Sequence, residues 1–117
     1  MDKGKYVPNK DSRQYVMDRK PFNGSNLWGS WCPSTIAEST DTHYVVFSHG
    51  HHYPMFIYAD GVWYENEDKS SRSTERQRSQ CRPVPRHDTY PLNTATMCRL
   101  AVLGMSELRK RRILGRL

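Results

Sequence analysis

Three short runs of β-branched and aromatic residues in the middle of the chain constrain its fold most. They cover residues 44–47, 55–58 and 62–64, and runs of this composition are typical of strands. The second and third runs are separated by a turn that contains Asp60 and Gly61, a pair that readily adopts the positive φ angles of a tight hairpin. The sequence therefore predicts an antiparallel three-stranded meander.

The connections of this meander carry their own signals. Gly50 is the predicted turn residue between the first two runs, within residues 48–53. Pro54 has no N–H to donate to a ladder, so we expect it at the start of its strand or on an edge. Residues 1–42 are rich in Asn, Ser, Asp, Pro and Gly, and we expect them to be largely irregular.

The last part of the sequence predicts an amphipathic helix over residues 93–112. Asn93 or Thr94 can cap it. An apolar stripe on one side ends near Leu108, so the basic residues beyond it are expected in solvent. The predicted fold class is α+β: one domain with residues 1–42 irregular, a small meander at 43–68, an Arg-rich segment at 69–86, and this C-terminal helix packed on the meander.

Length, hydropathy and cysteine spacing limit the kind of protein. The 117 residues suit one domain. No apolar run approaches the ~20 residues that cross a bilayer, and the N-terminus lacks the apolar stretch of a signal peptide. We therefore expect a cytoplasmic protein without a membrane partner. Cys32, Cys81 and Cys98 are far apart, which favours reduced thiols over a disulfide framework.

Charge is distributed unevenly along the chain. Residues 1–68 contain six Lys and Arg against nine acids, whereas residues 69–117 contain twelve against three. A half-chain with a net charge of +9 creates a positive potential that attracts a polyanion or an acidic protein surface. The basic residues that we consider as binding candidates are Arg72, Arg76, Arg78, Arg82, Arg86, Arg109, Lys110, Arg111 and Arg112.

The Arg-rich segment is the least ordinary part of the sequence. Ser71 or Ser73 could cap a short helix with Glu75 in its first turn, and Pro83 would end it. Apart from Cys81, such a helix has no apolar face. We therefore expect its Arg side chains to point outward and to stay unpaired, as a solvated surface or as a surface for a partner.

Arginine-rich surfaces suit nucleic acid. A guanidinium group binds phosphate in a bidentate way, and Tyr53, Trp63 or Tyr64 could stack on an exposed base. No recognised nucleic-acid motif is present in the sequence, so the charge predicts salt-sensitive binding with little sequence preference.

Evidence for an enzyme is weaker. His49, His51 and His52 lie in one predicted turn and are weak candidates for a metal site that could serve a hydrolase. Arg78 and Arg82 flank Cys81 and could favour its thiolate. No motif supplies a general base or an oxyanion hole, and no phosphate loop or dinucleotide fingerprint indicates a cofactor. The sequence therefore favours a binding protein with no catalytic residues and no cofactor.

The stretch from Tyr44 to Pro83 contains two apolar strands around a Pro, a Trp and a Tyr, and a Lys-x-Ser-x-x-Thr-x-Arg-x-x-x-Gln motif. The residues that form this pattern are Val45-Val46-Phe47-Ser48, Pro54, Phe56-Ile57-Tyr58, Trp63-Tyr64 and Lys69-Ser70-Ser71-Arg72-Ser73-Thr74-Glu75-Arg76-Gln77-Arg78-Ser79-Gln80. The pattern resembles that of a family of small uncharacterised proteins of tailed bacteriophages and other mobile elements. This chain departs from the family at Ser70, where Tyr is commoner, and at Gln77, where His is commoner.

The resemblance implies a setting, and it brings no activity with it. The setting is that of a phage accessory protein in the cytoplasm of a bacterial host. Two hypotheses follow: a binding module that engages nucleic acid through its Arg-rich face, or an inhibitor that uses the same face to cover a host defence or transcription complex. A metal-dependent hydrolase is a distant third.

Overall fold

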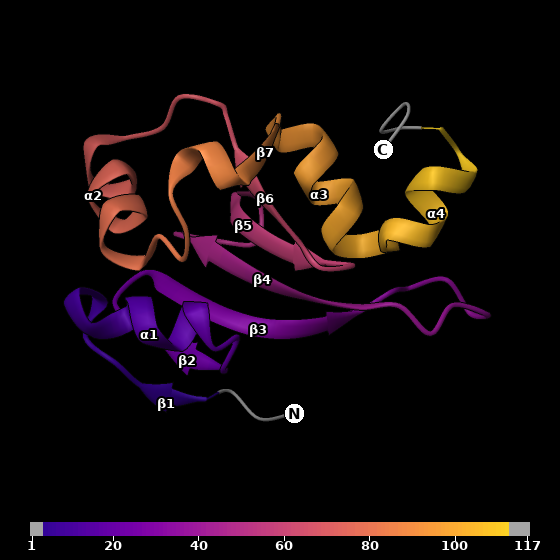
Figure 1. The fold of residues 1–117 in the computed structure, drawn as a ribbon. Coiled ribbons are helices and arrows are strands. Elements are labelled where there is room, and N and C mark those ends of the chain that lie inside the picture. Colours follow the sequence, from indigo (N-terminus) through magenta and orange to yellow (C-terminus); the bar gives the residue numbers. More distant parts are fainter. Residues whose placement is uncertain (1–3, 113–117) are drawn as a thin grey trace.

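The computed structural model describes residues 4–112 and folds them around one mixed sheet of seven strands (Figure 1). The prediction of an α+β fold agrees with this architecture, but the prediction of a small three-stranded meander is wrong. The strands are β1 (Lys5–Tyr6), β2 (Phe22–Asn23), β3 (Leu27–Pro33), β4 (Thr42–Ser48), β5 (Pro54–Ala59), β6 (Val62–Asn66) and β7 (Thr89–Leu92).

The described residues also form four α-helices and two short 3-10 helices. None of these helices combines the length and apolar character needed to cross a membrane. In chain order they are η1 (Asn9–Asp11), α1 (Ser12–Met17), α2 (Arg72–Cys81), η2 (Arg86–Asp88), α3 (Thr94–Leu103) and α4 (Met105–Lys110).

The strands lie side by side in their order along the chain. Strands β2 to β6 pair antiparallel, whereas β1 pairs parallel with β2 and β7 pairs parallel with β6. A parallel pair needs a crossover connection. Helix α1 lies in the crossover from β1 to β2, and α2 lies in the crossover from β6 to β7. The sheet therefore has one crossover connection at each of its two edges, one containing α1 and the other containing α2.

The central strands are continuous apolar runs because both faces of the sheet are covered. In β4, Tyr44 and Val46 belong to a core cluster that also contains Val16 and Cys81 of the crossover helices. Their neighbours along the strand point to the opposite face and join a second cluster with α3 and α4. Figure 1 shows α1 and α2 at the left of the molecule and α3 and α4 at its right.

Two details predicted for the central hairpins, the Asp60-Gly61 turn and the place of Pro54, agree with the structure. Asp60 and Gly61 have φ angles of 50° and 78° and join β5 to β6 as a tight turn. Pro54 begins β5, where its missing N–H breaks no ladder inside the strand. In the first turn the positive φ belongs to His49, at 64°, rather than to Gly50.

The prediction of a largely irregular N-terminal segment is wrong, because the described residues of this segment, 4–42, include β1, β2, β3 and α1. Strand β3 pairs along its whole length with β4, although its sequence includes Gly29, Ser30 and Pro33. A glycine fits at position 29 because a Cβ there would lie too close to the hydroxyl of Tyr44 on the neighbouring strand β4. The sequence of β3 therefore lacks the alternation of apolar and polar residues that would predict a strand.

The single helix predicted over residues 93–112 is divided in two. Gly104 has a φ of 87° between α3 and α4, and a Cβ there would lie 2.9 Å from the Cβ of Asp41. Asp41 then takes over as a cap for α4, accepting hydrogen bonds from the backbone N–H and the hydroxyl of Ser106 at 2.8 and 3.0 Å. Both helices still place their apolar residues on the sheet, including Leu100 and Leu108.

Candidate functional site

Helix α2 contains three of the nine candidate binding residues, and its buried side is polar. Ser71 caps it, accepting a hydrogen bond from the backbone N–H of Thr74 at 3.2 Å. The buried side chains are Thr74, Gln77, Arg78 and Cys81, which have the spacing of one helix face. The helix therefore packs through a polar stripe, and that stripe requires hydrogen-bonding partners in the sheet.

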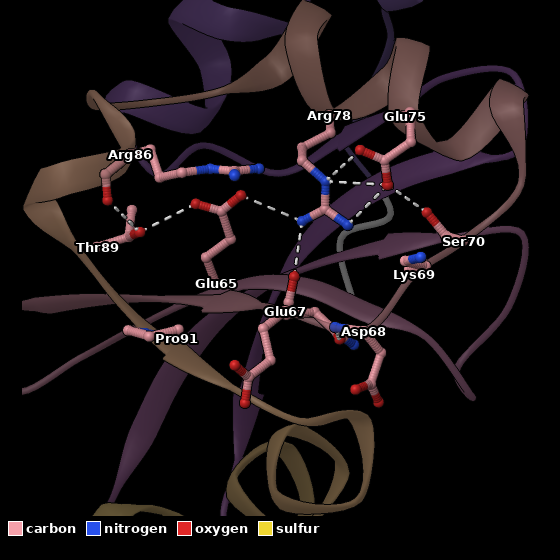
Figure 2. A pocket seen from close by; sticks show the side chains of 11 residues that line it. Glu65, Glu67, Asp68, Lys69, Ser70, Glu75, Arg78, Arg86, Thr89 and Pro91 are labelled. Atoms are coloured by element: carbon pink, nitrogen blue, oxygen red, sulfur yellow. Dashed lines mark hydrogen bonds and ion pairs between the residues drawn. The ribbon is translucent and has the colours of Figure 1, made fainter.

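Arg78 is the centre of this buried polar contact. Its guanidinium donates to Glu65 at 3.2 Å, to the carbonyl of Asn66 at 2.9 Å and to the hydroxyl of Tyr53 at 2.7 Å. Its remaining N–H groups donate to the carboxylate of Glu75 (Figure 2). An arginine has five N–H donors, and all five are engaged here. Arg78 therefore has no donor left for a phosphate.

Glu65 on β6 is saturated in the same way. Its carboxylate accepts two hydrogen bonds from Arg82, at 2.8 and 2.6 Å, one from the Thr89 hydroxyl at 2.9 Å and one from Arg78. Burial by itself raises the pKa of Glu65, but the hydrogen bonds of Arg82 and Thr89 and the charges of the two arginines outweigh it and lower that pKa. Glu65 is therefore a structural anion and not a general acid.

These contacts correct the expectation that the whole Arg-rich segment faces outward and stays unpaired. Arg78 is 4% exposed, and Arg82 is half-buried against Glu65. Arg72 and Arg76 do face outward, and neither forms an ion pair with another described residue. The segment thus consists of an inner structural pair and an outer pair that is open to a partner.

Several residues of the phage-protein resemblance contact one another at the start of this stripe. The buried Ser48 hydroxyl lies 3.1 Å from the Thr74 hydroxyl and donates to Gln77 Oε1 at 2.5 Å. The Gln77 amide donates to the carbonyls of Ser25 and Asn26 at 3.3 and 3.2 Å. The motif residues therefore join α2 to β4 and to the loop before β3, which is a structural role.

One cavity beside α2 has mixed charge. It has a volume of about 540 Å³ and lies next to Arg78 (Figure 2). The residues that line it, with four acids among them, are Glu65, Asn66, Glu67, Asp68, Lys69, Ser70, Glu75, Arg78, Arg86, Thr89 and Pro91. A polyanion would meet several carboxylates here, so this cavity does not favour one.

A second hollow lies between α2 and the segment η1–α1, and its charged residues are all basic. It has a volume of about 440 Å³ and is lined by Lys10, Arg13, Arg76, Ser79 and Gln80. Arg13 donates to the carbonyl of Ser79 at 2.6 Å, which ties α1 to α2. Within residues 4–112, the buried Oε1 of Gln80 has no hydrogen-bond partner. We call this hollow the basic groove.

The other candidate cations lie elsewhere. Arg86 is exposed beside the mixed-charge cavity. The basic residues at the end of the chain are exposed on and after α4, on the opposite side of the molecule from α2 (Figure 1). Arg109 donates to Asp60 at 2.7 Å and Arg111 to Glu107 at 2.9 Å, so both are already paired. The structure therefore does not bring Arg109, Lys110, Arg111 and Arg112 together with the arginines of α2.

The aromatic and histidine candidates are also separated. Trp63 and Tyr64 are buried in the two core clusters and present no ring to a base, whereas Tyr53 is half-buried at the surface. His51 packs against Trp28, with ring centroids 5.3 Å apart, while His49 and His52 line a different hollow. In the described residues no three His, Cys, Asp or Glu side chains are grouped so that they could hold a metal ion.

Cys81 is placed where a nucleophile would be inactive. It is fully buried against Met55, and this burial raises the pKa of its thiol to about 12 in spite of Arg78 and Arg82. A thiol with such a pKa is protonated at neutral pH and cannot act as the thiolate that catalysis needs.

Sequence reasoning did not identify Lys10 and Arg13 as candidates. They lie in a segment with no local basic cluster, more than 60 positions before Arg76. Only the two crossover connections bring η1 and α1 against α2. No local pattern could have revealed this, because the groove depends on the parallel pairing at both ends of the sheet.

Comparison with known proteins adds no relatives. No protein-family model matches the chain, and neither a curated protein nor a solved structure matches it.

Proposed function

We propose that the protein is a nucleic-acid-binding module that uses the basic groove between η1–α1 and α2. The carrying observation is that Lys10, Arg13 and Arg76 line one hollow although they come from distant parts of the chain, and no acid lines it with them. Cations gathered in a concave surface focus positive potential and contact phosphates.

The basic side chains of the groove have charges and hydrogen-bond donors that could contact a phosphate. Lys10 and Arg76 form no ion pair with another described residue, and Arg13 uses one N–H on Ser79 while others remain for a phosphate. Arg72, exposed one turn before Arg76 on α2, extends the positive surface along the helix.

Three cations predict a modest, salt-dependent affinity. Each phosphate that is neutralised releases counterions, so three contacts to a single strand predict a slope of about −2 in a plot of log K against log salt. Arg78 and Arg82 do not contribute to this estimate, because both are paired with Glu65.

Fluorescence anisotropy with labelled single-stranded and duplex oligonucleotides, over a salt series, tests the proposal. The variant Lys10→Gln/Arg76→Gln should lose most of the affinity and reduce the salt slope by more than half, because two of three phosphate contacts are gone. The charge-reversing variant Arg72→Glu/Arg76→Glu should abolish binding and leave the fold intact, since both side chains are exposed.

A matched control removes two charges elsewhere. Arg99→Gln/Lys110→Gln changes exposed cations on α3 and α4 without touching the basic groove. It should keep nearly the full affinity. Equal losses in the two double variants would show that only net charge matters, and failure of the parent protein to bind any oligonucleotide at ~50 mM salt would eliminate the proposal.

The second hypothesis is an inhibitor of a host defence or transcription complex. An acidic protein surface that met the same groove would compete with an oligonucleotide for Lys10 and Arg76. The resemblance to phage proteins supports a role of either kind inside a bacterial host cell, and the cytoplasm is the proposed location. Nuclease-treated host lysate passed over the parent protein and over Lys10→Gln/Arg76→Gln would identify a protein partner that depends on the groove.

A further inference from the structure

A third hollow borders α2 at its first turn and is not part of the basic groove. It has a volume of about 280 Å³ and combines aromatic rings, hydroxyl groups and one ammonium group. Its lining residues are Ser48, His49, His52, Tyr53, Lys69, Ser70, Ser71 and Thr74. This combination has the parts that a nucleotide requires, which are flat surfaces for a base and polar groups for a phosphate.

Tyr53 provides a fixed wall. Its hydroxyl donates to the carbonyl of Asp68 at 3.0 Å and accepts from Arg78 at 2.7 Å. The side chain is only half-buried, although the hydroxyl is held at both ends of this hydrogen-bond chain. A ring whose orientation is fixed loses little conformational freedom when a base stacks on it.

The loop before Tyr53 places two histidines at the same hollow. A Cβ on Gly50 would lie 2.6 Å from Nδ1 of His52, so the imidazole of His52 lies directly against this glycine. His49 has a positive φ, and its Nε2 lies 3.2 Å from the Ser73 hydroxyl at the start of α2. His51 turns away and packs on Trp28, which anchors the loop.

The polar groups of this hollow suit an anion. Lys69 is exposed and forms no ion pair with another described residue. The hydroxyl groups of Ser70 and Ser71 are already used, because they donate to Glu75 and to Thr74. None of the residues that line this hollow is a carboxylate, so a phosphate could be held by the Lys69 ammonium group, which also borders the mixed-charge cavity.

We infer that this hollow is a subsite for one nucleotide of a single strand, with the base against Tyr53 and His52 and the phosphate beside Lys69. The inference rests on the proposed function, which it extends by naming a single strand as the ligand. Helix α2 has ten residues and spans about 15 Å, so a strand that passes Arg72 can occupy both this subsite and the basic groove. A base that is stacked in the hollow cannot be paired, and a duplex is therefore excluded from the subsite.

Uridine monophosphate is the test probe, added to the full chain and followed by NMR of the imidazole and tyrosine ring signals. We expect signals of His49, His52 and Tyr53 to shift together and saturably, while those of His87 stay in place. His52→Ala and Lys69→Gln should each weaken this binding about tenfold. The matched controls His87→Ala and Lys110→Gln change an exposed histidine and an exposed lysine elsewhere, and they should leave it unchanged.

Other results would overturn the inference. If inorganic phosphate produced the same shifts at the same concentration, binding would depend on charge alone and not on the base. An equal loss of mononucleotide affinity in the control variants would lead to the same conclusion. The variant Lys10→Gln/Arg76→Gln separates the two proposals, because it should remove most of the oligonucleotide affinity and leave the mononucleotide shifts intact. Mononucleotide binding without any effect of the groove variant on oligonucleotides would support the subsite and refute the groove.

Discussion

Replacing Arg78 by methionine should destabilise the fold strongly, although Arg78 belongs to the segment that looks most exposed in the sequence. Methionine keeps an unbranched stem and removes every donor. The change would leave Glu65 with Arg82 but without its buried partner, and it would leave the Asn66 carbonyl and the Tyr53 hydroxyl without their guanidinium donor.

The magnitude follows from the burial of the two ends of the ion pair. The side chains of Arg78 and Glu65 are each 5% exposed, and removing one partner of such a pair costs about 3–5 kcal/mol. Arg82 still neutralises Glu65, which favours the lower end of this range. Glu75 is 48% exposed, so the loss of its pair adds less than about 1 kcal/mol. We expect a loss of about 3 kcal/mol and a fall in Tm of about 10–15 °C.

Urea unfolding followed by tryptophan fluorescence measures this loss, and Arg76→Met is the matched control. Arg76 lies on the same helix but is exposed, so its replacement should change the free energy of unfolding by less than about 0.5 kcal/mol. In a double-mutant cycle, Glu65→Gln and Arg78→Met should couple by about 1–3 kcal/mol. A loss below about 1 kcal/mol for Arg78→Met, or one equal to that of Arg76→Met, would refute the structural role assigned to this arginine.

Three further predictions concern pH, backbone and thiol reactivity. The fold lowers the pKa of Glu65 from 4.5, so the ionised carboxylate contributes its full stabilisation above that value. This stabilisation is lost as the pH falls through the folded pKa. In acid titrations, the free energies of unfolding of the parent and of Glu65→Gln should therefore converge as the pH is lowered from about 5. Gly104→Ala should cost about 1–3 kcal/mol in urea unfolding, since it forces a positive φ and a contact with Asp41; an unchanged midpoint would contradict this. Cys81 should react with a disulfide reagent much more slowly than half-buried Cys98 until urea is added, and equal native rates would show that Cys81 is accessible.

Local chemistry was sufficient to predict the centre of the sheet. The runs of β4, β5 and β6 and the Asp60-Gly61 turn are visible because each depends on neighbouring residues alone. The outer strands are not visible in this way. Strands β1 and β2 have two residues each, and β3 is specified by the fit of Gly29 against Tyr44, which is a property of the partner strand. The sequence was therefore informative about half of the sheet.

The candidate site was likewise only partly predictable from the sequence. The stripe of Thr74, Gln77, Arg78 and Cys81 has the spacing of a buried helix face, and it was overlooked because its members are polar. Their partners lie on β4 and β6, so only the folded chain shows that Arg78 is satisfied and Arg76 is free. Counting the arginines of α2 and its C-cap overestimated the binding surface, because Arg78 and Arg82 are paired with Glu65.

The ends of the sheet have a consequence for self-association. An unpaired sheet edge is a template on which another chain can add a strand, and such growth leads to aggregates. Here β1 offers only two residues, Lys5 and Tyr6, and β7 carries Pro91, which lacks the N–H that an added strand would need. Neither edge strand of the described sheet is long and regular, so the fold resists the addition of further strands. These edge strands, β1 and β7, also form the two parallel pairs whose crossover connections create the basic groove.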